Sequence, residues 1–260
     1  MLQDSGRGPE GGRGRKDKGK AAGILCTWVR SVAERHHQWF GAPLGLNLNN
    51  NALRIAIGLR LGVPLVMPHQ CPCGAAVDKL GHHGLACKRS AGRHLRHNLL
   101  NDGILRALQS AGVQAVREPS GLDRGGGKRP DGVTLVPWAR GRCLLWDAMC
   151  PDTLAPSHVV NSSTEAGSAG KAAESKKVTK YATLATAHEF VPVARERMGT
   201  WGICGLAFVN EIGRRIAEVN GEPRSTASLK QRLSLAVQRG NAASVLGTLA
   251  LSITSATDEH

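Results

Sequence analysis

The chain has 260 residues, 41% of them hydrophobic, which is enough to bury the core of one large domain or two small ones. Its 34 Lys and Arg against 20 Asp and Glu give a net charge of +14, which favours a polyanionic partner, above all nucleic acid. No apolar run approaches the roughly 18 residues of a membrane span, and the N-terminus lacks the apolar core of a signal peptide. We therefore expect an intracellular protein without a membrane partner.

The N-terminal part of the chain divides into two segments of different composition. Residues 1–22 combine many glycines and basic residues with almost no apolar ones, so we expect a disordered basic tail. Residues 23–70 have apolar positions at helical intervals and are expected to form a helical segment of two short helices. Leu53, Ile57 and Leu61 are predicted to form one buried stripe of the second helix.

A cluster of metal-ligand residue types follows in a Gly-rich stretch. Cys71, Cys73, His82 and Cys87 offer three thiolates and one imidazole, the complement of a closed, structural zinc site. His83 is an alternative fourth ligand, which the spacing leaves open. The odd total of seven cysteines is typical of reduced thiols rather than disulfides. We predict a CCHC-type zinc knuckle over residues 71–92.

Residues 93–222 are predicted to form an α/β domain with a mixed sheet. The apolar periodicity between Leu100 and Leu108 indicates a first helix, which begins near residue 93. Residues 223–260 are expected to be a C-terminal helical segment, interrupted near Gly240. Within the α/β domain we expect strands at 113–117, 132–136 and 142–150, a helix at 172–187, a strand at 190–193 and a helix around 209–219.

The second and third strands form a hairpin that brings two acidic residues together. If its loop is centred on Ala139, then Asp131 and Asp147, each eight residues from that centre, face each other across the pair. A carboxylate in the apolar run around Asp147 is costly unless it is paired, hydrogen-bonded or bound to a metal. Two facing carboxylates suit a hard divalent ion, Mg²⁺ above all. The alternative is that Asp131 caps a turn and Asp147 pairs with an arginine.

The stretch Arg129-Pro130-Asp131, the hairpin and the second acid on a central strand resemble the PD-(D/E)XK nuclease superfamily, which includes restriction endonucleases and many repair nucleases. The resemblance implies a restriction-endonuclease-like core of helix, three strands, helix and strand. It also implies phosphodiester hydrolysis in which Asp131 and Asp147 bind Mg²⁺. In that superfamily a lysine usually stands two residues after the second acid, where this chain has Met149.

Lysines of the following helix could bring an ammonium group to the same place. On a helical wheel Lys177 borders the inward stripe that contains Tyr181, and Lys180 is the second candidate. Glu174 also lies on the inward stripe, so it either joins the site or pairs with a basic residue. Glu118, at the end of the first strand, is a further candidate for the metal side of the site.

A more specific resemblance joins these motifs in one order. The Cys-x-Cys, His, Cys cluster, Arg96-His97-Asn98, the two aspartates and the Lys-x-x-Lys-Tyr helix resemble the C-terminal region of non-LTR retrotransposon polyproteins, which carries a restriction-like endonuclease. The resemblance covers roughly residues 50–185. It implies an enzyme that nicks target DNA, so that the exposed 3′ end primes reverse transcription of the element's RNA. It further implies a nuclear location and contact with both DNA and RNA.

Arg93, Arg96 and His97 stand at the start of the first helix of the α/β domain. We expect them to contact phosphates, which supply affinity and register without sequence choice. The chain has no aromatic-x-Asp-Asp motif, so the polymerase is absent from it. The alternative to an active nuclease is a catalytically decayed nucleic-acid-binding module derived from such an element, and a third reading is a junction-resolving or repair nuclease.

Overall fold

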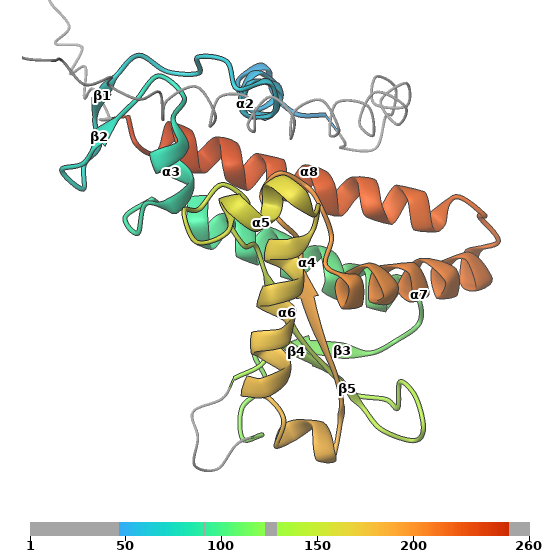
Figure 1. Cartoon of the computed structure of the whole chain (residues 1–260). Helices are drawn as coiled ribbons and strands as arrows, with labels where there is room; N and C mark the ends of the chain where they lie inside the picture. The colour runs from blue at the N-terminus through green and yellow to red at the C-terminus, as the bar shows by residue number, and fades with distance from the viewer. Residues whose placement is uncertain (1–46, 91, 123–128, 250–260) are drawn as a thin grey trace, which may run out of the picture. The chain divides into compact units, whose positions relative to one another are not determined.

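The computed structural model describes residues 47–90, 92–122 and 129–249, which belong to one compact unit (Figure 1). The expected basic tail at 1–22, the first helix expected in 23–70 and the last eleven residues of 223–260 lie outside the described residues. The helices are α2 (Asn50–Leu61), α3 (His82–Ala86), α4 (Gly92–Ser110), α5 (Val159–Thr164), α6 (Ser168–Lys180), the 3₁₀ helix η2 (Leu184–Thr186), α7 (Ile203–Asn220) and α8 (Ser225–Leu246). The strands are β1 (His69–Gln70), β2 (Ala76–Val77), β3 (Ala115–Arg117), β4 (Gly132–Thr134), β5 (Leu144–Met149) and β6 (Glu189–Ala194). None of these helices combines the length and hydropathy needed to cross a membrane.

The central sheet has four strands in the order β3-β4-β5-β6. The pairs β3-β4 and β4-β5 are antiparallel, whereas β6 lies parallel to β5 and is reached through α5 and α6. A mixed sheet with helices confirms the predicted α/β class. Along the chain α4 is followed by three strands, α6, β6 and α7, which is the predicted order apart from the short helices α5 and η2.

The hairpin of β4 and β5 has the predicted register. Gly132 lies opposite Trp146 and Val133 lies opposite Leu145. β4 ends at Thr134, earlier than predicted. The Thr134 hydroxyl accepts the Leu144 N–H and donates to the Val136 carbonyl, so a side chain replaces the backbone pairing there. Gly132 is required at its position, since a Cβ there would lie 2.0 Å from the indole ring of Trp146.

The two faces of β5 are buried against different helices. Trp146 and its alternate neighbours belong to the main core, which α4, α7 and α8 complete. Leu145 packs on the other face with Tyr181, the residue that ends α6. Because side chains alternate along a strand, Asp147 lies on the same face as Leu145 and therefore on the side of α6.

Helix α8 is continuous, so the predicted interruption near Gly240 is wrong. Gly240 instead permits a close crossing of α8 with α4, because a Cβ there would lie 2.4 Å from the Cβ of Arg96. Gly92 has the same function at the start of α4, where a Cβ would lie 2.2 Å from the backbone nitrogen of Ser244. The C-terminal helix therefore packs into the same core as the sheet and is not a separate appendage.

Helix α2 is present within the predicted helical segment, but its buried face differs from the predicted stripe. Ala52, Ile55 and Leu59 are buried, whereas Ile57 and Leu61 are about half exposed. The buried set follows the mixed three- and four-residue spacing of a helix face, while the predicted set followed four-residue spacing alone. The buried face packs in one cluster with residues of α3 and α8.

Candidate functional site

Asp147 lies within β5, and its side chain is only 3% exposed. The Nζ atom of Lys177, from α6, lies 2.7 Å from Asp147 Oδ1 and supplies the counter-charge that a buried carboxylate requires. The contact is an ion pair without hydrogen-bond geometry, and Oδ1 has no hydrogen-bond donor among the described residues. The charge of the buried Asp147 is therefore compensated by Lys177 through an ion pair.

Tyr181 explains why α6 presents Lys177 to the sheet. Its ring is fully buried beside Leu145, and its hydroxyl donates to the backbone oxygen of Arg129 at 2.8 Å. Lys177 stands one helical turn before Tyr181 and so projects on the same side of α6. Lys180 is exposed, and its Nζ lies 4.8 Å from the centroid of the Tyr181 ring. Within the described part of the chain Lys180 forms no ion pair with either aspartate.

Asp131 stands directly before β4 and is held from two sides. Its Oδ1 lies 3.1 Å from Nε2 of His97, and its Oδ2 accepts the Ala148 N–H at 2.7 Å. Burial raises the pKa of Asp131, but the hydrogen bond and positive charge of His97 lower it more, so its pKa lies below the usual value. The same hydrogen bond raises the pKa of His97, against a smaller lowering by burial.

Asn101 extends this network into the core. Trp146 Nε1 donates to Asn101 Oδ1 at 3.0 Å, and Asn101 Nδ2 lies 3.2 Å from His97 Nε2. The buried indole thus fixes an amide that lies against the His97 and Asp131 pair. This role of Asn101 is not among the sequence-based predictions. Its four-residue spacing from His97, which places the two on one face of α4, was the available signal.

The carboxylates of Asp131 and Asp147 both lie close enough to Tyr181 and His97 to raise the pKa of each. Burial raises the pKa of Tyr181, and the negative charges of Asp147 and Asp131 raise it further. Both aspartates also contribute to the raised pKa of His97. Gly132 and Trp146 are the last observed pair of the hairpin register. Asp131, just before Gly132, and Asp147, just after Trp146, stand one position beyond that pair.

Glu118 contributes its backbone rather than its carboxylate. Its N–H donates to the backbone oxygen of Asp131 at 2.9 Å, and its φ of 48° is left-handed, which is uncommon outside glycine. The carboxylate is 66% exposed and lies 3.5 Å from Arg117. Glu118 therefore supports the position of Asp131, and its side chain is directed to Arg117 and solvent.

The predicted phosphate contacts differ in their surroundings. Arg93 is exposed at the start of α4, and the side chain of His97 is 40% exposed. Arg96 is only 1% exposed, and its guanidinium donates to Asn241 at 2.8 Å and to Ser244 at 3.2 Å. The expectation that Arg96 contacts phosphate is corrected, because Gly240 brings α8 so close that the guanidinium is enclosed between the helices.

Glu174 is buried, and within the described ranges it neither contacts the two aspartates nor pairs with a basic residue. Its Oε1 accepts the Gly205 N–H at 2.9 Å and its Oε2 accepts the Cys204 N–H at 3.1 Å. These amides are the free donors at the N-terminus of α7, where a negative charge is favourable. Glu174 therefore anchors α6 to α7 and keeps Lys177, one turn further along α6, in place.

The cysteine cluster has a different histidine from the one we predicted first. The ligand atoms of Cys71, Cys73, His83 and Cys87 all lie within 4.8 Å of one another, so this group could hold a metal ion such as zinc. His83 Nε2 lies 3.2 Å from the Cys73 sulfur. His82 is replaced by His83 because α3 begins at residue 82, and the four-residue spacing of His83 and Cys87 places both on one side of that helical turn.

The cluster is built from a small hairpin and α3. Cys71 and Cys73 lie in the turn between β1 and β2, where the Cys71 N–H donates to Ala75 and the Gly74 N–H donates to Cys71. The Ala75 N–H lowers the pKa of the Cys73 thiol, which favours the thiolate that binds metal. Leu85 of α3 anchors this unit in the core that α2 and α8 form.

No protein-family model matches this sequence, and no curated protein matches it. What can be inferred about its function comes from the side-chain arrangement around Asp131 and Asp147 and from the cysteine cluster.

Proposed function

We propose that the chain is a metal-dependent DNA endonuclease that nicks its target, as its resemblance to the endonuclease of non-LTR retrotransposons implies. The observation that carries this proposal is the gathering of Asp131, Asp147 and Lys177 at one end of the central sheet. These residues come from three separate segments and include a buried, charged pair. Two acids and a lysine at one strand end are the groups that metal-dependent phosphodiester hydrolysis requires.

The two aspartates fit a magnesium ion. Mg²⁺ prefers carboxylate oxygens, and the buried Oδ1 of Asp147 lacks a hydrogen-bond donor among the described residues. Asp131 and Asp147 would hold the ion, which when bound activates water and neutralises charge on the phosphate. His97 orients the Asp131 carboxylate through its hydrogen bond, in the way that outer partners orient metal ligands.

In this proposal Lys177 has the role of the lysine that follows the second acid in PD-(D/E)XK nucleases. Met149 occupies that position on β5, but the ammonium of Lys177 reaches Asp147 from α6. Its side chain is 28% exposed, so one side of the ammonium is open to a substrate phosphate or an attacking water. We propose that Lys177 orients the nucleophile or stabilises the developing negative charge, and that Lys180 only adds positive charge nearby.

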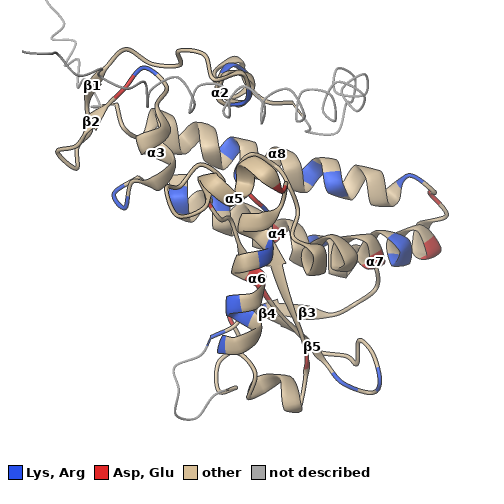
Figure 2. Ribbon diagram, in the orientation of Figure 1, with Lys and Arg blue, Asp and Glu red and all other residues tan. Residues whose placement is uncertain are grey.

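The remaining features support nucleic-acid binding. Lys and Arg are spread along α8 and gather at the C-terminal end of α6, whereas Asp and Glu are sparse on both (Figure 2). Arg93 is exposed and His97 is partly exposed on the α4 turn that contacts Asp131, where both could contact phosphates of a bound strand. We propose zinc for the Cys71, Cys73, His83 and Cys87 cluster, in a structural role.

Nicking of supercoiled plasmid DNA tests the proposal directly. We expect the full chain to convert supercoiled DNA to open circles in the presence of Mg²⁺ and not without a divalent ion. Asp131→Ala should lower this rate about 100-fold or more, because the metal loses a ligand, while DNA binding in a gel shift persists. Glu165→Ala, an exposed acid on another segment, is the control and should nick like the wild type. Equal nicking by Asp131→Ala would refute the assignment.

One observation favours the alternative of a decayed nucleic-acid-binding module. The lysine position of the superfamily motif is filled by Met149, which has no charge to offer. A decayed module would bind DNA through its basic surface but would not nick it with Mg²⁺ or Mn²⁺. The same plasmid assay, scored beside a gel shift of the same protein sample, separates the two functions.

A further inference from the structure

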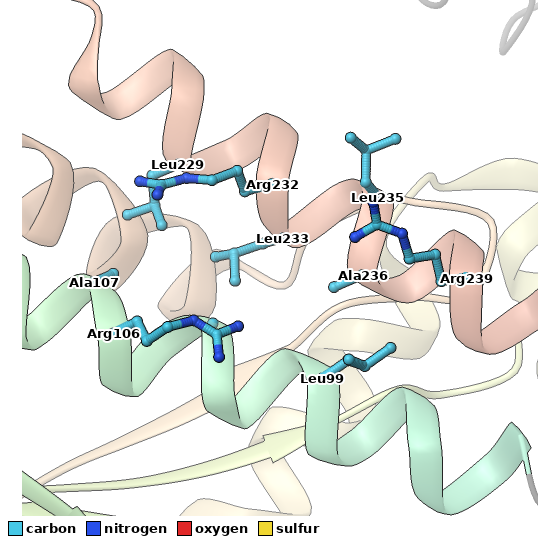
Figure 3. A pocket seen from close by; sticks show the side chains of 10 residues that line it. Leu99, Arg106, Ala107, Leu229, Arg232, Leu233, Leu235, Ala236 and Arg239 are labelled. Atoms are coloured by element: carbon cyan, nitrogen blue, oxygen red, sulfur yellow. The ribbon is translucent and has the colours of Figure 1, made fainter. Parts of the chain in front are cut away.

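A groove lies between α4 and α8 (Figure 3). Its volume is about 130 Å³, and Leu99 of α4 and Leu233 of α8 are among the apolar side chains that line it. Its charged lining consists of three arginines and contains no acidic residue. Arg106 comes from α4, while Arg232 and Arg239 come from α8, on the opposite side of the groove.

The groove lies apart from the proposed catalytic centre. His97, which contacts Asp131, and Arg106, which lines the groove, are nine residues apart on α4. At about 100° per residue this spacing places them on opposite sides of the helix, about 180° apart. A ligand bound in the groove therefore lies on the opposite side of α4 from the side that contacts Asp131.

Two of the three guanidinium groups have no acidic partner in the part of the chain that the structure describes. Arg106 and Arg232 are exposed, and neither forms an ion pair within the described residues. Arg239 donates to the backbone oxygen of Asn47 at 3.1 Å, which holds its guanidinium at the groove. Uncompensated guanidinium groups at an apolar groove on a chain of charge +14 match an anionic ligand that also has an apolar part.

We propose that this groove binds the phosphate backbone of a nucleic-acid strand, at a second contact outside the catalytic centre. Arg106 and Arg232 bind phosphate oxygens, for which the planar guanidinium can form two parallel hydrogen bonds. Leu99, which is partly exposed, supplies the apolar contact beside the strand. The choice of nucleic acid rests on the proposed function, but the site does not require cleavage to occur.

Binding of a fluorescein-labelled DNA duplex to the full chain, measured by anisotropy without Mg²⁺ over a range of salt concentrations, tests this site. The test variant is Arg106→Gln with Arg232→Gln, and the control is Arg54→Gln with Arg140→Gln, two exposed arginines outside the groove. Each lost phosphate contact reduces the slope of log K against log salt by about 0.9. The groove variant should therefore lose about 2 in slope and at least tenfold in affinity, and the control markedly less. Matching thermal melts confirm that both variants are folded.

The outcomes separate this site from the nuclease proposal. If the chain does not nick plasmid but the groove variant loses the predicted slope, the groove stands and the nuclease assignment fails. If wild type nicks but both double variants bind alike, the groove proposal is wrong. Inorganic phosphate at the same total phosphate concentration is the second probe. If it raises the melting temperature of the wild type as much as the duplex does, the site is for free phosphate and the proposal also fails.

Discussion

Lys177 and Asp147 form an ion pair between α6 and β5, with Nζ and Oδ1 2.7 Å apart. The two residues are thirty positions apart in the sequence, and the pair exists because the buried Tyr181 fixes the end of α6 against Leu145. The buried carboxylate on the strand is thus paired with a lysine from a neighbouring helix. This pair has consequences for stability and for the nuclease activity that we propose.

Replacing Lys177 with Met should destabilise the protein by about 1–3 kcal/mol. Removing one partner of a buried pair leaves an uncompensated charge, and the value is reduced here because the ammonium is partly exposed. Urea unfolding measures the change. Lys176→Met, the exposed neighbour, is the matched control and should change stability by less than about 0.5 kcal/mol. In the Lys177→Met background Asp147→Asn should restore part of the loss; a further loss would show that the charge of Asp147 is compensated elsewhere.

Substitution of one of two adjacent histidines should decide the metal ligand. His83→Ala should lower bound zinc well below one equivalent per chain and reduce the melting temperature, because the fourth ligand is lost. His82→Ala should retain zinc near one equivalent. Elemental analysis of the purified proteins gives the stoichiometry. Retention of zinc by His83→Ala and its loss in His82→Ala would reverse the assignment.

The His97 and Asp131 pair should make stability depend on pH. The raised pKa of His97 means that its contribution is complete below the ordinary histidine value and is lost as pH rises through the raised value. The lowered pKa of Asp131 means that its contribution is present above the ordinary aspartate value and is lost as pH falls through the lowered value. The pair should therefore stabilise most between about pH 4 and 6.5.

Unfolding of the wild type and of His97→Asn, without divalent ions, measures this contribution. We expect a difference of about 1 kcal/mol at pH 5, reduced from the value of a charged hydrogen bond by solvent exposure. The difference should shrink well above the raised pKa of His97, for example at pH 9. An equal difference at both pH values would mean that the ionic part of the pair contributes nothing.

Substitution of Arg96 should affect stability, whereas substitution of Arg93 should affect nucleic-acid binding. Arg96→Ala should cost about 3 kcal/mol, because Asn241 and Ser244 lose their donor inside the α4 and α8 contact. Arg93→Ala should leave stability unchanged and weaken DNA binding. Unfolding and anisotropy measured on the same two variants provide the comparison. A stable Arg96→Ala protein that has lost DNA affinity would return Arg96 to the role of a phosphate contact.

Gly240→Ala should destabilise the protein although alanine is the better helix former by about 1 kcal/mol. The added methyl group would lie 2.4 Å from the Cβ and 2.6 Å from the Cα of Arg96, and the backbone of α4 cannot move aside as a flexible side chain would. Overpacking of this kind costs about 1–3 kcal/mol. Thermal melting detects the change, and a higher melting temperature in Gly240→Ala would show that α4 and α8 are less tightly packed.

Local patterns predicted the sheet well. The register of β4 and β5 follows from a loop centred on Ala139, and the observed pairs Gly132 with Trp146 and Val133 with Leu145 agree with it. The order of helices and strands also agrees, because apolar periodicity reports which side of each element is buried. A helical wheel favours Lys177 over Lys180, and Lys177 is the lysine that contacts Asp147.

Contacts between distant segments were not predictable in this way. The crossing of α4 and α8 makes Gly240 a packing position and encloses Arg96, and nothing near either residue in the sequence signals the other helix. Glu174 holds backbone amides at the start of α7, which follows it by about thirty residues. The choice of His83 over His82 depended on where a single helical turn begins, which is the least predictable part of a helix.

Mn²⁺ binding followed by electron paramagnetic resonance tests most directly our proposal that Asp131 and Asp147 share one divalent ion. With the cysteine cluster loaded with zinc beforehand, the wild-type chain should bind one Mn²⁺. Asp131→Asn and Asp147→Asn should each weaken that binding about tenfold or more, because each removes one carboxylate ligand. A wild-type chain that binds no Mn²⁺ outside the zinc cluster, or variants that bind it as tightly as the wild type, would contradict the claim.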